Sequence, residues 1–440
     1  MITLFEDFSL ESAALYQSLK LAGNETPTIV MEDDGFLPDD IITPYQYFAK
    51  YQPTPQDKPK YFNAVPIPKF WEIEGNNESA SVNDNGKTRA RIQYKRNFMS
   101  RIVQNVEWLS EDGKVRAIDH YTKHGIKYAQ TVKDSTEKSI FKLYFDQSGH
   151  IIIYENYVTG NITLTWNDKE QIFNNKHEFV AYFIDQLEVD ASKIIFNSLA
   201  RPLMVIYNRK QPTQGYLFWQ EHVQNELPGN MKTILASQGE REFKVVVPNP
   251  IEHARITTMA DKAARHKVVK SGYLYQYHRK NQYSKQVMNV TNSDQLPNIE
   301  RIVEQSPDYT FHIAAITEMS SVLMGLGKYR NVKLYPSAEM KAIRRLYEIA
   351  DVYLDINRGN EILNAVRSAY DYDMLIMGYR EIAHNKSFTS SELLFGETEV
   401  DKLIQHIHLT KKEKEQLLKK QKAQANEIDK QRFNEALDII

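Results

Sequence analysis

Seven polar or charged residues in the second half of the chain have the types and positions expected of a ligand-binding site. Each lies near the predicted end of a strand or the predicted start of a helix. At such places, side-chain amides and carboxylates can act together with free backbone N–H groups to bind a hydroxyl-rich ligand. The candidate residues are His312, Glu318, Asn357, Arg358, Asn360, Glu361 and Asn364.

Some of these residues also have a purely structural interpretation. Asn360 can cap a helix predicted to begin at Glu361, and Asn364 can pack locally. His312 lies in an apolar run, where a buried histidine with satisfied hydrogen bonds is the simpler interpretation. No second histidine or carboxylate stands at metal-ligand spacing from His312, so we expect neither a metal nor a cofactor.

Alternating strands and helices must position these residues. Their close spacing is typical of a parallel sheet with right-handed crossovers. The predicted strands are Val287–Val290, Thr310–Ile316, Val332–Tyr335, Val352–Asp355 and Met374–Gly378, and the predicted helices are Leu296–Glu304, Glu339–Ala350 and Glu361–Tyr370.

The N-terminal part of the chain has a similar pattern, which again indicates a doubly wound sheet. A strand, a helix and a strand open it, and the pattern resumes after about residue 170. The predicted strands are Met1–Phe5, Thr28–Met31, Lys193–Phe196, Met204–Tyr207, Tyr216–Trp219 and Phe243–Val247, with helices at Leu10–Leu21 and Lys176–Leu187.

Between these two stretches, the sequence from about Phe70 to Trp166 reads as strand after strand. Five prolines in residues 51–68 form a connector before it. An aromatic residue stands four or five positions before Gly113, Gly125 and Gly149, as in a meander of hairpins whose turns need glycine. We therefore expect an antiparallel β domain inserted in the first α/β domain.

Aromatic residues in or beside this predicted β domain allow two interpretations. They could stack on sugars or line a peptide groove, but packing in a core or across strands is the simpler role. An exposed strand edge could instead pair with a partner or with an extended peptide. The aromatic residues are Trp71, Trp108, Tyr121 and Trp166.

These patterns predict an α/β fold with two Rossmann-like domains, an arrangement typical of GT-B glycosyltransferases, and an extended antiparallel sheet inserted in the first. The expected divisions are 1–60 and 168–248 for domain I, 61–167 for the inserted sheet, 249–408 for domain II and 409–440 for a helical tail. The tail can pack on the body, or form a basic amphipathic helix for a membrane or a partner.

Composition excludes several classes of protein. The 440 residues carry 55 basic and 57 acidic side chains, a formal net charge of -2, which argues against a nucleic-acid binder. There is no cysteine, so disulfides and thiolate metal sites are excluded. The N-terminal sequence has no basic segment followed by an apolar run, and no stretch reaches the length of a membrane span, so we expect a cytoplasmic protein.

A nucleotide-sugar transferase of the GT-B type needs cations to neutralise the diphosphate leaving group. In retaining enzymes of this fold, an arginine and a lysine usually follow the first strand of the second domain. The corresponding stretch, Val290–Leu296, contains no cation and one acid, Asp294. A carboxylate beside a diphosphate is electrostatically unfavourable.

Two further features of such a donor site are also missing. The enzymes carry two glutamates eight positions apart, and our alignment places Ile356 and Asn364 there, with Glu361 one helical turn away. The N-terminal turn Phe5–Leu10 has two acids and no glycine to let a phosphate approach closely. We infer that the sugar-donor site is lost, and that the degenerate cleft could hold an acceptor peptide or a sugar already attached to it.

Several long stretches of the chain carry a family resemblance. They are Gly215–Glu221, Pro228–Met231, Phe311–Ser321 and Gly359–Arg367, with Thr26–Val30, Gly35–Pro38 and Ala117–Tyr121. They resemble the stabilising, non-catalytic subunit of the bacterial accessory-Sec O-GlcNAc transferase, over nearly the whole chain.

The resemblance implies a function. In this family a catalytic partner transfers GlcNAc from UDP-GlcNAc to Ser and Thr of serine-rich repeat adhesins in the cytosol. The subunit that this chain resembles has no activity alone; it stabilises the partner and helps it to recognise the unfolded acceptor. Both subunits carry an extended β domain. The adhesin then leaves through the accessory Sec route, so peripheral contact with the cytoplasmic face of the membrane is also implied.

Two other functions remain open from the residues alone. One is an active GT-B glycosyltransferase with an atypical donor site, in which Glu361 would take part in catalysis. The other is a stand-alone glycan-binding module, which requires affinity for sugar without any protein partner.

Overall fold

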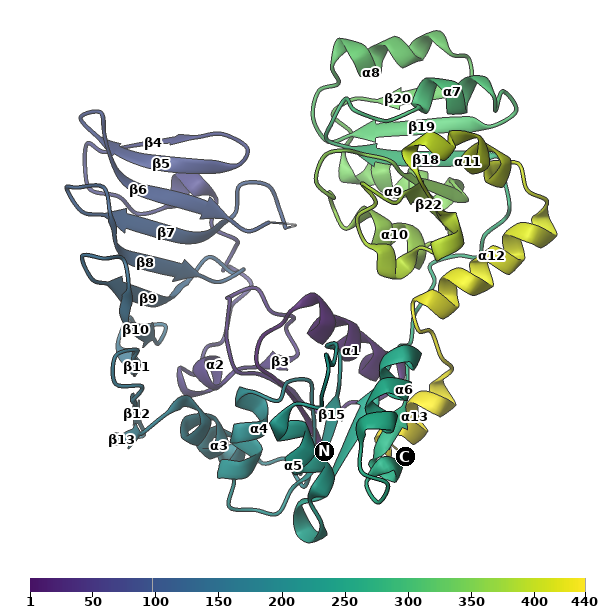
Figure 1. Ribbon diagram of the computed structural model, residues 1–440. Helices are drawn as coiled ribbons and strands as arrows, with labels where there is room; N and C mark the ends of the chain where they lie inside the picture. Colours follow the sequence, from purple (N-terminus) through teal and green to yellow (C-terminus); the bar gives the residue numbers. More distant parts are fainter. Residues whose placement is uncertain (97, 440) are drawn as a thin grey trace. The chain divides into compact units, whose positions relative to one another are not determined.

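The computed structural model describes residues 1–96 and 98–439, and the chain divides into two compact units (Figure 1). The first unit comprises Met1–Ser271 together with Asn434–Ile440, and the second comprises Gly272–Phe433. Each unit contains a parallel sheet with its own hydrophobic core.

A seven-stranded parallel sheet forms the centre of the first unit, in the order β17-β16-β15-β14-β1-β2-β3. Its strands are β1 (Ile2–Phe5), β2 (Thr28–Val30), β3 (Ile41–Ile42), β14 (Lys193–Phe196), β15 (Gln214–Phe218), β16 (Phe243–Val247) and β17 (Val268–Lys270). The helices of this unit are α1 (Leu10–Leu21), α2 (Pro44–Phe48), α3 (Lys176–Gln186), α4 (Arg201–Asn208), α5 (Gly229–Ala236) and α6 (Pro250–Met259).

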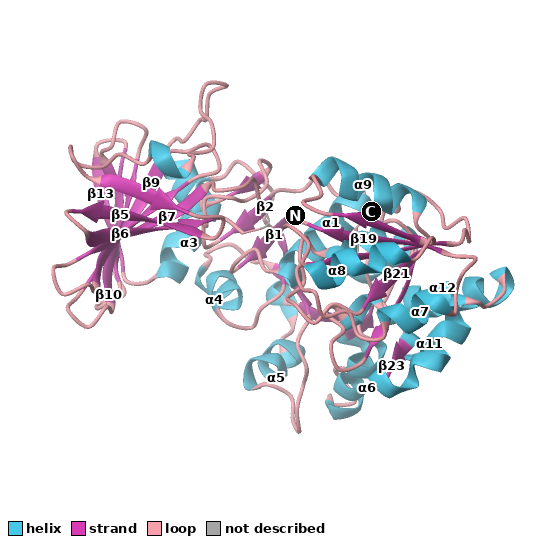
Figure 2. Ribbon diagram, turned by 90° about the horizontal axis from the view of Figure 1, so that it is seen from above, coloured by secondary structure: helices cyan, strands magenta, loops and turns pink. Residues whose placement is uncertain are grey.

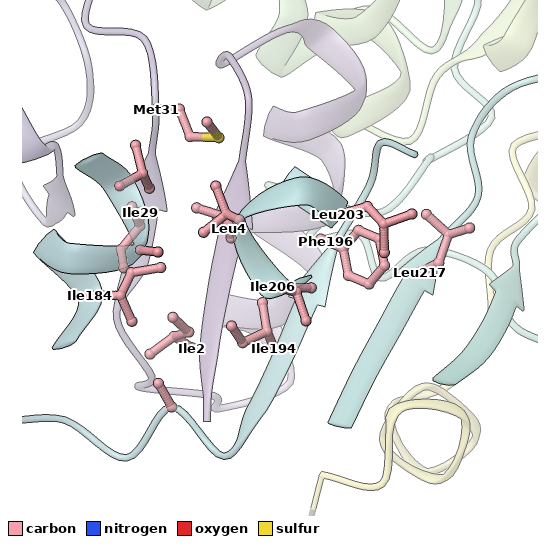
Figure 3. Packing of buried hydrophobic residues seen from close by; sticks show 14 of the residues in the cluster. Ile2, Leu4, Ile29, Met31, Ile184, Ile194, Phe196, Leu203, Ile206 and Leu217 are labelled. Atoms are coloured by element: carbon pink, nitrogen blue, oxygen red, sulfur yellow. The ribbon is translucent and has the colours of Figure 1, made fainter. Parts of the chain in front are cut away.

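Consecutive apolar residues explain why these strands lie inside the unit. Every residue of β1 is buried, as expected for a parallel strand that is covered on both faces. Ser9 caps α1 by accepting a hydrogen bond from the backbone N–H of Ser12. Figure 3 shows β1 and its neighbours packing against α3 and α4 through Ile2, Leu4, Ile29, Ile184, Ile194, Phe196, Leu203 and Ile206.

One predicted strand is wrong. Met204–Tyr207 was expected to be a strand, but these residues belong to α4. Pro202 stands in the first turn of this helix, where its missing N–H has no consequence. Leu203 and Ile206 face the core while Tyr207 is exposed, a helical periodicity that a short apolar run cannot distinguish from a strand.

The second sheet of the first unit is antiparallel and has ten strands in the simple order β13 to β4. Figure 2 shows its strands fanned out by their progressive twist. In sequence it lies between β3 and β14 of the parallel sheet. The strands are β4 (Glu72–Gly75), β5 (Ser79–Asp84), β6 (Lys87–Tyr94), β7 (Val103–Leu109), β8 (Val115–Tyr121), β9 (Lys127–Lys133), β10 (Ser139–Phe145), β11 (Ile151–Asn156), β12 (Ile162–Trp166) and β13 (Lys169–Phe173).

Aromatic residues of this sheet pack in cores, as the simpler interpretation held. Trp71, Trp108 and Tyr121 belong to a cluster at the β4–β8 end, and the Trp108 indole donates a hydrogen bond to Asp119 at 2.8 Å. Trp166 packs edge-on against the ring of Phe48, with centroids 5.2 Å apart. The glycine turns also have the predicted positive φ; in the β8–β9 turn, a Cβ on Gly125 would stand 2.2 Å from a backbone carbonyl oxygen.

The other end of the antiparallel sheet is anchored on the parallel-sheet domain. The rings of Tyr45 and Tyr144 stack with centroids 3.9 Å apart. Beside them, the ammonium of Lys176 lies between the carboxylates of Glu32, at 2.6 Å, and Glu155, at 2.8 Å. Tyr45 and Tyr144 belong to one hydrophobic core that also includes residues of the parallel-sheet domain, so the β9–β13 end of the sheet is fixed to its host domain.

The second unit is built on a six-stranded parallel sheet in the order β20-β19-β18-β21-β22-β23. Its strands are β18 (Gln286–Thr291), β19 (Thr310–Ala315), β20 (Val332–Tyr335), β21 (Val352–Asp355), β22 (Leu375–Tyr379) and β23 (Leu394–Phe395). Its helices are α7 (Ile299–Glu304), α8 (Ser321–Gly325), α9 (Met340–Ile349), α10 (Ala365–Asp371), α11 (Val400–Ile407) and α12 (Lys411–Gln424).

The charged tail forms two helices. In α12, Leu417 and Leu418 are buried in the core of the second unit, and Thr410 caps the helix in a capping box with Glu413. The chain then continues through α13 (Lys430–Leu437) into the first unit, where Asp438 accepts a hydrogen bond from the Tyr216 hydroxyl at 2.8 Å. These contacts match the expectation of a tail packed on the body.

Candidate functional site

The topological switch point of the second sheet lies between β18 and β21. From β18 the chain crosses to β19 and β20 on one side, and then returns to β21, β22 and β23 on the other. In open parallel sheets of this kind, ligands bind in the crevice that forms at the carboxyl ends of the strands at this point. The segments that follow β18 and β21 therefore decide whether the crevice can take a ligand.

Hydrogen bonds join these two segments to each other. The Thr291 hydroxyl donates to the Asn357 side-chain oxygen at 2.9 Å, and the Asn357 amide donates to the side-chain oxygen of Asn292 at 3.1 Å. The backbone N–H of Arg358 donates to the carbonyl of Gln295 at 3.2 Å. Thr291 and Asn357 are both buried, so these bonds lie inside the protein.

Gly359 lets the two segments approach closely. Its N–H donates to the side-chain oxygen of Asn357 at 3.0 Å. A Cβ at this position would stand only 2.0 Å from the side-chain oxygen of Asn292, so another residue type would displace the Asn292 side chain. Thr291, Asn292, Asn357 and Gly359 are called the asparagine knot below.

A histidine that the sequence analysis did not single out, His384, contacts the asparagine knot. His384 lies in the segment after β22, and its Nδ1 is 2.5 Å from the carboxylate of Asp355, the last residue of β21. Its Nε2 is 2.8 Å from the carbonyl oxygen of Gly359. Both ring nitrogens therefore face acceptors. The hydrogen bond to Asp355 is the main cause that raises the pKa of His384 to about 9, against the opposing effect of burial.

Two positive groups thus lie around the crevice, and each has its own carboxylate. The imidazolium of His384 is paired with Asp355. The guanidinium of Arg358 lies 2.6 Å from both carboxylate oxygens of Glu397. The absence of a cation in the segment after β18 was predicted from the sequence, but the pairing of these two cations is visible only in the structure.

Arg358 and Glu397 stand at the edge of an open cavity of about 730 Å³. A neighbouring cavity of about 570 Å³ shares Asp294, Leu296, Asn298 and Arg301 with it, so the two form one groove. Arg301 is held by Asp401 at 2.6 Å. Side chains able to donate or accept hydrogen bonds dominate the Arg358 end of the groove.

The remaining candidates around the knot have separate roles. The helix expected at Glu361 begins four residues later, at Ala365, so Asn360 does not cap it. The Glu361 carboxylate instead accepts a hydrogen bond from the backbone N–H of Val366 at 3.0 Å and thus satisfies the first turn of α10. Asn360 is exposed, and Asn364 is exposed in a left-handed conformation directly before the helix.

His312 and Glu318 are not part of this cluster. His312 is buried within β19, where its Nδ1 is 2.9 Å from the Tyr335 hydroxyl and its Nε2 is 2.7 Å from the side-chain oxygen of Gln286. Burial lowers the pKa of His312 to about 4, so it is neutral and satisfied at neutral pH. Glu318 is exposed in the segment after β19, and within residues 1–96 and 98–439 it forms no ion pair.

The first unit has an equivalent switch point between β1 and β14, and it is acidic. A cavity of about 250 Å³ lies at the carboxyl ends of β1, β14 and β15. Four carboxylates line it, on Glu6, Asp7, Glu11 and Glu221. This charge disfavours a phosphate group, in line with the prediction from the turn after β1.

In the part of the chain that the structure describes, no three histidine, aspartate or glutamate side chains lie together as metal ligands would. None of the helices in it combines the length and the apolar character needed to cross a lipid bilayer.

Comparison with known proteins identifies the family. Four family models match in sequence: the GtfB N-terminal domain over residues 2–48, the GtfB middle domain over 71–174, the GtfB third domain over 176–259 and the GftB/GlyA-F C-terminal domain over 287–424. A stabilising protein, GtfB, of UDP-N-acetylglucosamine–peptide N-acetylglucosaminyltransferase from Streptococcus pneumoniae is 38% identical, covering 100% of this chain and 99% of the relative. The protein of the same description from Streptococcus agalactiae is 36% identical, covering 99% of both.

Solved structures agree. A chain of a GtfA/B complex bound to UDP and GlcNAc superposes with a TM-score of 0.92 at 35% identity, covering 100% of this chain and 99% of that one. The pneumococcal O-GlcNAc transferase GtfA has a TM-score of 0.52 at 13% identity, covering 99% and 97%, which shows a shared fold. The predicted α/β, GT-B-like class is thereby confirmed, as is the resemblance seen in the sequence. With full-length relatives at this level of identity, this chain belongs to the GtfB family of transferase-stabilising proteins.

Proposed function

We propose that this chain is the non-catalytic subunit of a UDP-GlcNAc:protein O-GlcNAc transferase complex. It stabilises a catalytic transferase and binds the unfolded, Ser/Thr-rich acceptor, a serine-rich repeat adhesin, at the cytoplasmic face of the membrane. The asparagine knot carries this proposal, because its hydrogen bonds join the segments after β18 and β21 at the switch point, where a nucleotide sugar would bind. The names of the full-length relatives support it.

The electrostatics of the crevice support the same conclusion. Transfer from a sugar diphosphate needs positive charge that is free to stabilise the leaving group. At this crevice, Asp355 neutralises His384, and Glu397 neutralises Arg358. A diphosphate would have to displace a carboxylate from each cation, with a large desolvation cost for the buried one.

The finer architecture belongs to the same proposal. We place the extended sheet, expected at 61–167, as an insertion in the first Rossmann-like domain, expected at 1–60 and 168–248. The strand order supports the insertion, since β3 and β14 belong to one parallel sheet while β4 to β13 form another. The expected start of the second domain at residue 249 is too early, because β17 pairs with β16 in the first sheet and the first unit continues to Ser271. The ten-stranded sheet extends to Phe173, a few residues beyond the proposed boundary.

The extended sheet offers a surface for the catalytic partner. Along β9 to β13, one face is buried in the core through Tyr144, Ile153 and Leu164. The opposite face is only half covered and has apolar side chains among polar ones such as Gln130 and Thr163. It carries Val132, Phe141, Leu143, Tyr154 and Ile172, of which Ile172 is 65% exposed. These five residues are called the outer sheet face.

The shared fold favours a transferase as the occupant of the outer sheet face. The pneumococcal transferase GtfA matches this chain along nearly the whole length of both, so a partner of that kind carries a comparable sheet. Two related chains can associate through equivalent faces in a pseudo-twofold arrangement. A half-exposed aromatic and aliphatic face fits an interface whose centre is depleted of charge.

The polar groove beside the knot is our candidate for acceptor contact. Its Arg358 end is lined by Asp294, Gln295, Asn298 and Thr398. Amide, hydroxyl and carboxylate groups match a chain that presents Ser and Thr hydroxyls, bare or glycosylated, better than an apolar peptide. The groove is open rather than a closed pocket, which suits an extended polypeptide.

Isothermal titration with UDP-GlcNAc tests the proposal. We expect no measurable binding of UDP-GlcNAc to the isolated chain. We expect the co-purified complex to bind UDP-GlcNAc with the same affinity as the catalytic partner alone. Tight binding to the isolated chain would contradict the proposal. Transfer of radiolabelled GlcNAc by the isolated chain, abolished in Glu361→Ala, would favour the alternative of an active GT-B glycosyltransferase with an atypical donor site.

A further inference from the structure

The outermost strand of the extended sheet, β4, has a free edge. It ends the order of strands in that sheet, next to β5 (Figure 1). Across the β4–β5 hairpin, the backbone N–H of Asn76 donates to the carbonyl oxygen of Ser79 at 2.9 Å. Backbone groups alternate in direction along an antiparallel strand, so this bond fixes which residues of β4 face β5. The backbone N–H and C=O groups of Ile73 and Gly75 face away from it.

These outward backbone groups are unpaired in the part of the chain that the structure describes. There, no hydrogen bond from another segment reaches Ile73 or Gly75, and β4 has no second neighbouring strand. Gly75 is exposed and Ile73 is half-buried. An unpaired strand edge of this kind is a template for a further strand supplied by another polypeptide.

Phe70, two residues before β4, is an aromatic residue in an unfavourable place. It is 87% exposed, and its φ of +74° lies in the left-handed region that bulky residues rarely adopt. Its ring lies 5.0 Å from the ammonium of Lys69 and outside the hydrophobic cluster at this end of the sheet. A strained and exposed aromatic residue beside a free edge indicates an anchor for a partner.

Two carboxylates decide which polypeptide fits the edge. Glu72 and Glu74 are exposed and lie on the same face of β4, because side chains two positions apart share a face. Glu74 accepts a hydrogen bond from the Asn83 amide at 3.1 Å, and neither carboxylate forms an ion pair with a described residue. The charged side chains of the edge and of its turn are Lys69, Glu72, Glu74, Glu78 and Arg101.

A second copy of β4 is a poor occupant of this edge. Antiparallel pairing of two copies would place Glu72 and Glu74 beside the same carboxylates of the other copy, and like charges on facing strands are destabilising. Side chains that donate hydrogen bonds are favoured instead, and the hydroxyls of Ser and Thr are donors. Thr also favours an extended backbone. Main-chain pairing does not depend on the order of side chains, so it suits a repetitive chain without a fold of its own.

We propose that β4 is a strand-addition site for an extended, Ser/Thr-rich polypeptide. The main chain of this polypeptide pairs with Ile73 and Gly75, its hydroxyls donate to Glu72 and Glu74, and Phe70 packs on its threonine methyl groups. The proposal rests on the function proposed above for the identity of the ligand. It adds a contact on the first unit to the polar groove of the second.

Fluorescence anisotropy with the full-length chain and a labelled Ser/Thr-repeat peptide tests this proposal. Ile73→Pro removes the outward N–H and keeps the ladder to β5, because proline is tolerated where the nitrogen of an edge strand faces solvent. We expect this variant to bind the peptide about tenfold more weakly. Ile172→Pro is the matched control, since Ile172 lies on β13 at the opposite edge and its N–H also faces away from the sheet. Its affinity for the peptide should equal that of the wild type.

Phe70→Gly tests the anchor without disturbing the fold. Glycine adopts a φ of +74° without strain, so the melting temperature should equal or exceed that of the wild type. We expect the affinity for the peptide to fall at least about threefold, because the aromatic contact is lost. This variant carries the test if Ile73→Pro fails to fold.

The outcomes separate this proposal from the function on which it rests. Wild-type affinity in both Ile73→Pro and Phe70→Gly would overturn strand addition and leave the proposed function intact, with Asn298→Ala in the polar groove as the variant that then loses binding. Tighter binding of a peptide in which lysine replaces the hydroxyl residues would overturn the choice of ligand. Absence of peptide binding to the wild type would overturn the acceptor-binding function, and strand addition with it.

Discussion

The carboxylate of Asp355 receives two hydrogen bonds from His384, one from its backbone N–H at 2.7 Å and one from its ring at 2.5 Å. The ring also reaches the carbonyl oxygen of Gly359, so one imidazolium connects the end of β21 with the segment that follows it. In this crevice, His384 provides a positive charge and the carboxylate of Asp355 neutralises it.

This ion pair predicts a pH dependence of stability. The pKa of His384 is raised from 6.5 to about 9 in the folded protein. Its stabilising contribution is therefore fully present below pH 6.5 and is lost as the pH rises through about 9. We expect the difference in unfolding free energy between the wild type and His384→Gln to fall by at most about 3 kcal/mol between pH 6 and pH 10.

Urea unfolding of both proteins across this pH range measures that difference. Lysine and tyrosine side chains also titrate above pH 9, but their contributions cancel because both proteins contain them. A difference that stays constant from pH 6 to pH 10 would show that His384 is not charged in the folded protein.

The asparagine knot predicts a large effect of a single amide. Asn357→Ala removes the hydrogen bonds to Thr291, Asn292 and the N–H of Gly359, and leaves buried polar groups unpaired. We expect a loss of about 2–4 kcal/mol in unfolding free energy. Asn360→Ala, three residues away and exposed, is the matched control and should change stability by less than about 0.5 kcal/mol. Equal effects of the two variants would refute a structural role for the knot.

Glu361 provides a test that separates a structural role from a catalytic one. Its carboxylate satisfies the N–H of Val366 at the start of α10. Glu361→Ala should therefore cost about 0.5–2 kcal/mol of stability, as the loss of other helix caps does. In the complex with a catalytic partner, we expect the rate of GlcNAc transfer to stay within about twofold of the wild type. A loss of activity of a hundredfold with unchanged stability would assign Glu361 to catalysis.

If the outer sheet face binds the catalytic partner, a charged substitution on this face should weaken the complex. Leu143→Lys places a charge in the middle of this half-buried face, while the buried face of the same strand stays intact. We expect binding to the catalytic partner to weaken at least tenfold, since burying an unpaired charge in an interface is costly.

The control for this experiment is Leu10→Lys. Leu10 is 73% exposed and lies on α1, outside the extended sheet, and the chemical change is the same. Affinity measured by biolayer interferometry should be unchanged in this variant. If both variants bind the partner like the wild type, the partner docks elsewhere.

The sequence by itself determined the class of fold and the family. Apolar runs such as Ile2–Phe5 and Val352–Asp355 have a strand's length and are followed by helical periodicity, and regularly spaced glycine turns separate the antiparallel strands. These patterns are local, so they can be read along the chain. The missing cations after β18 and the long family motifs are local in the same sense.

Only the tertiary structure decided how the candidate site is arranged. His384 and Asp355 are 29 positions apart, and Thr291 and Asn357 are 66 apart, so no spacing in the sequence announces either contact. The strand order of the second sheet brings these residues to one edge, because β18 and β21 are neighbours in space and not in sequence. Met204–Tyr207 is helical for a similar reason. An apolar run this short is compatible with either a strand or a helix, and packing against the core favours the helix.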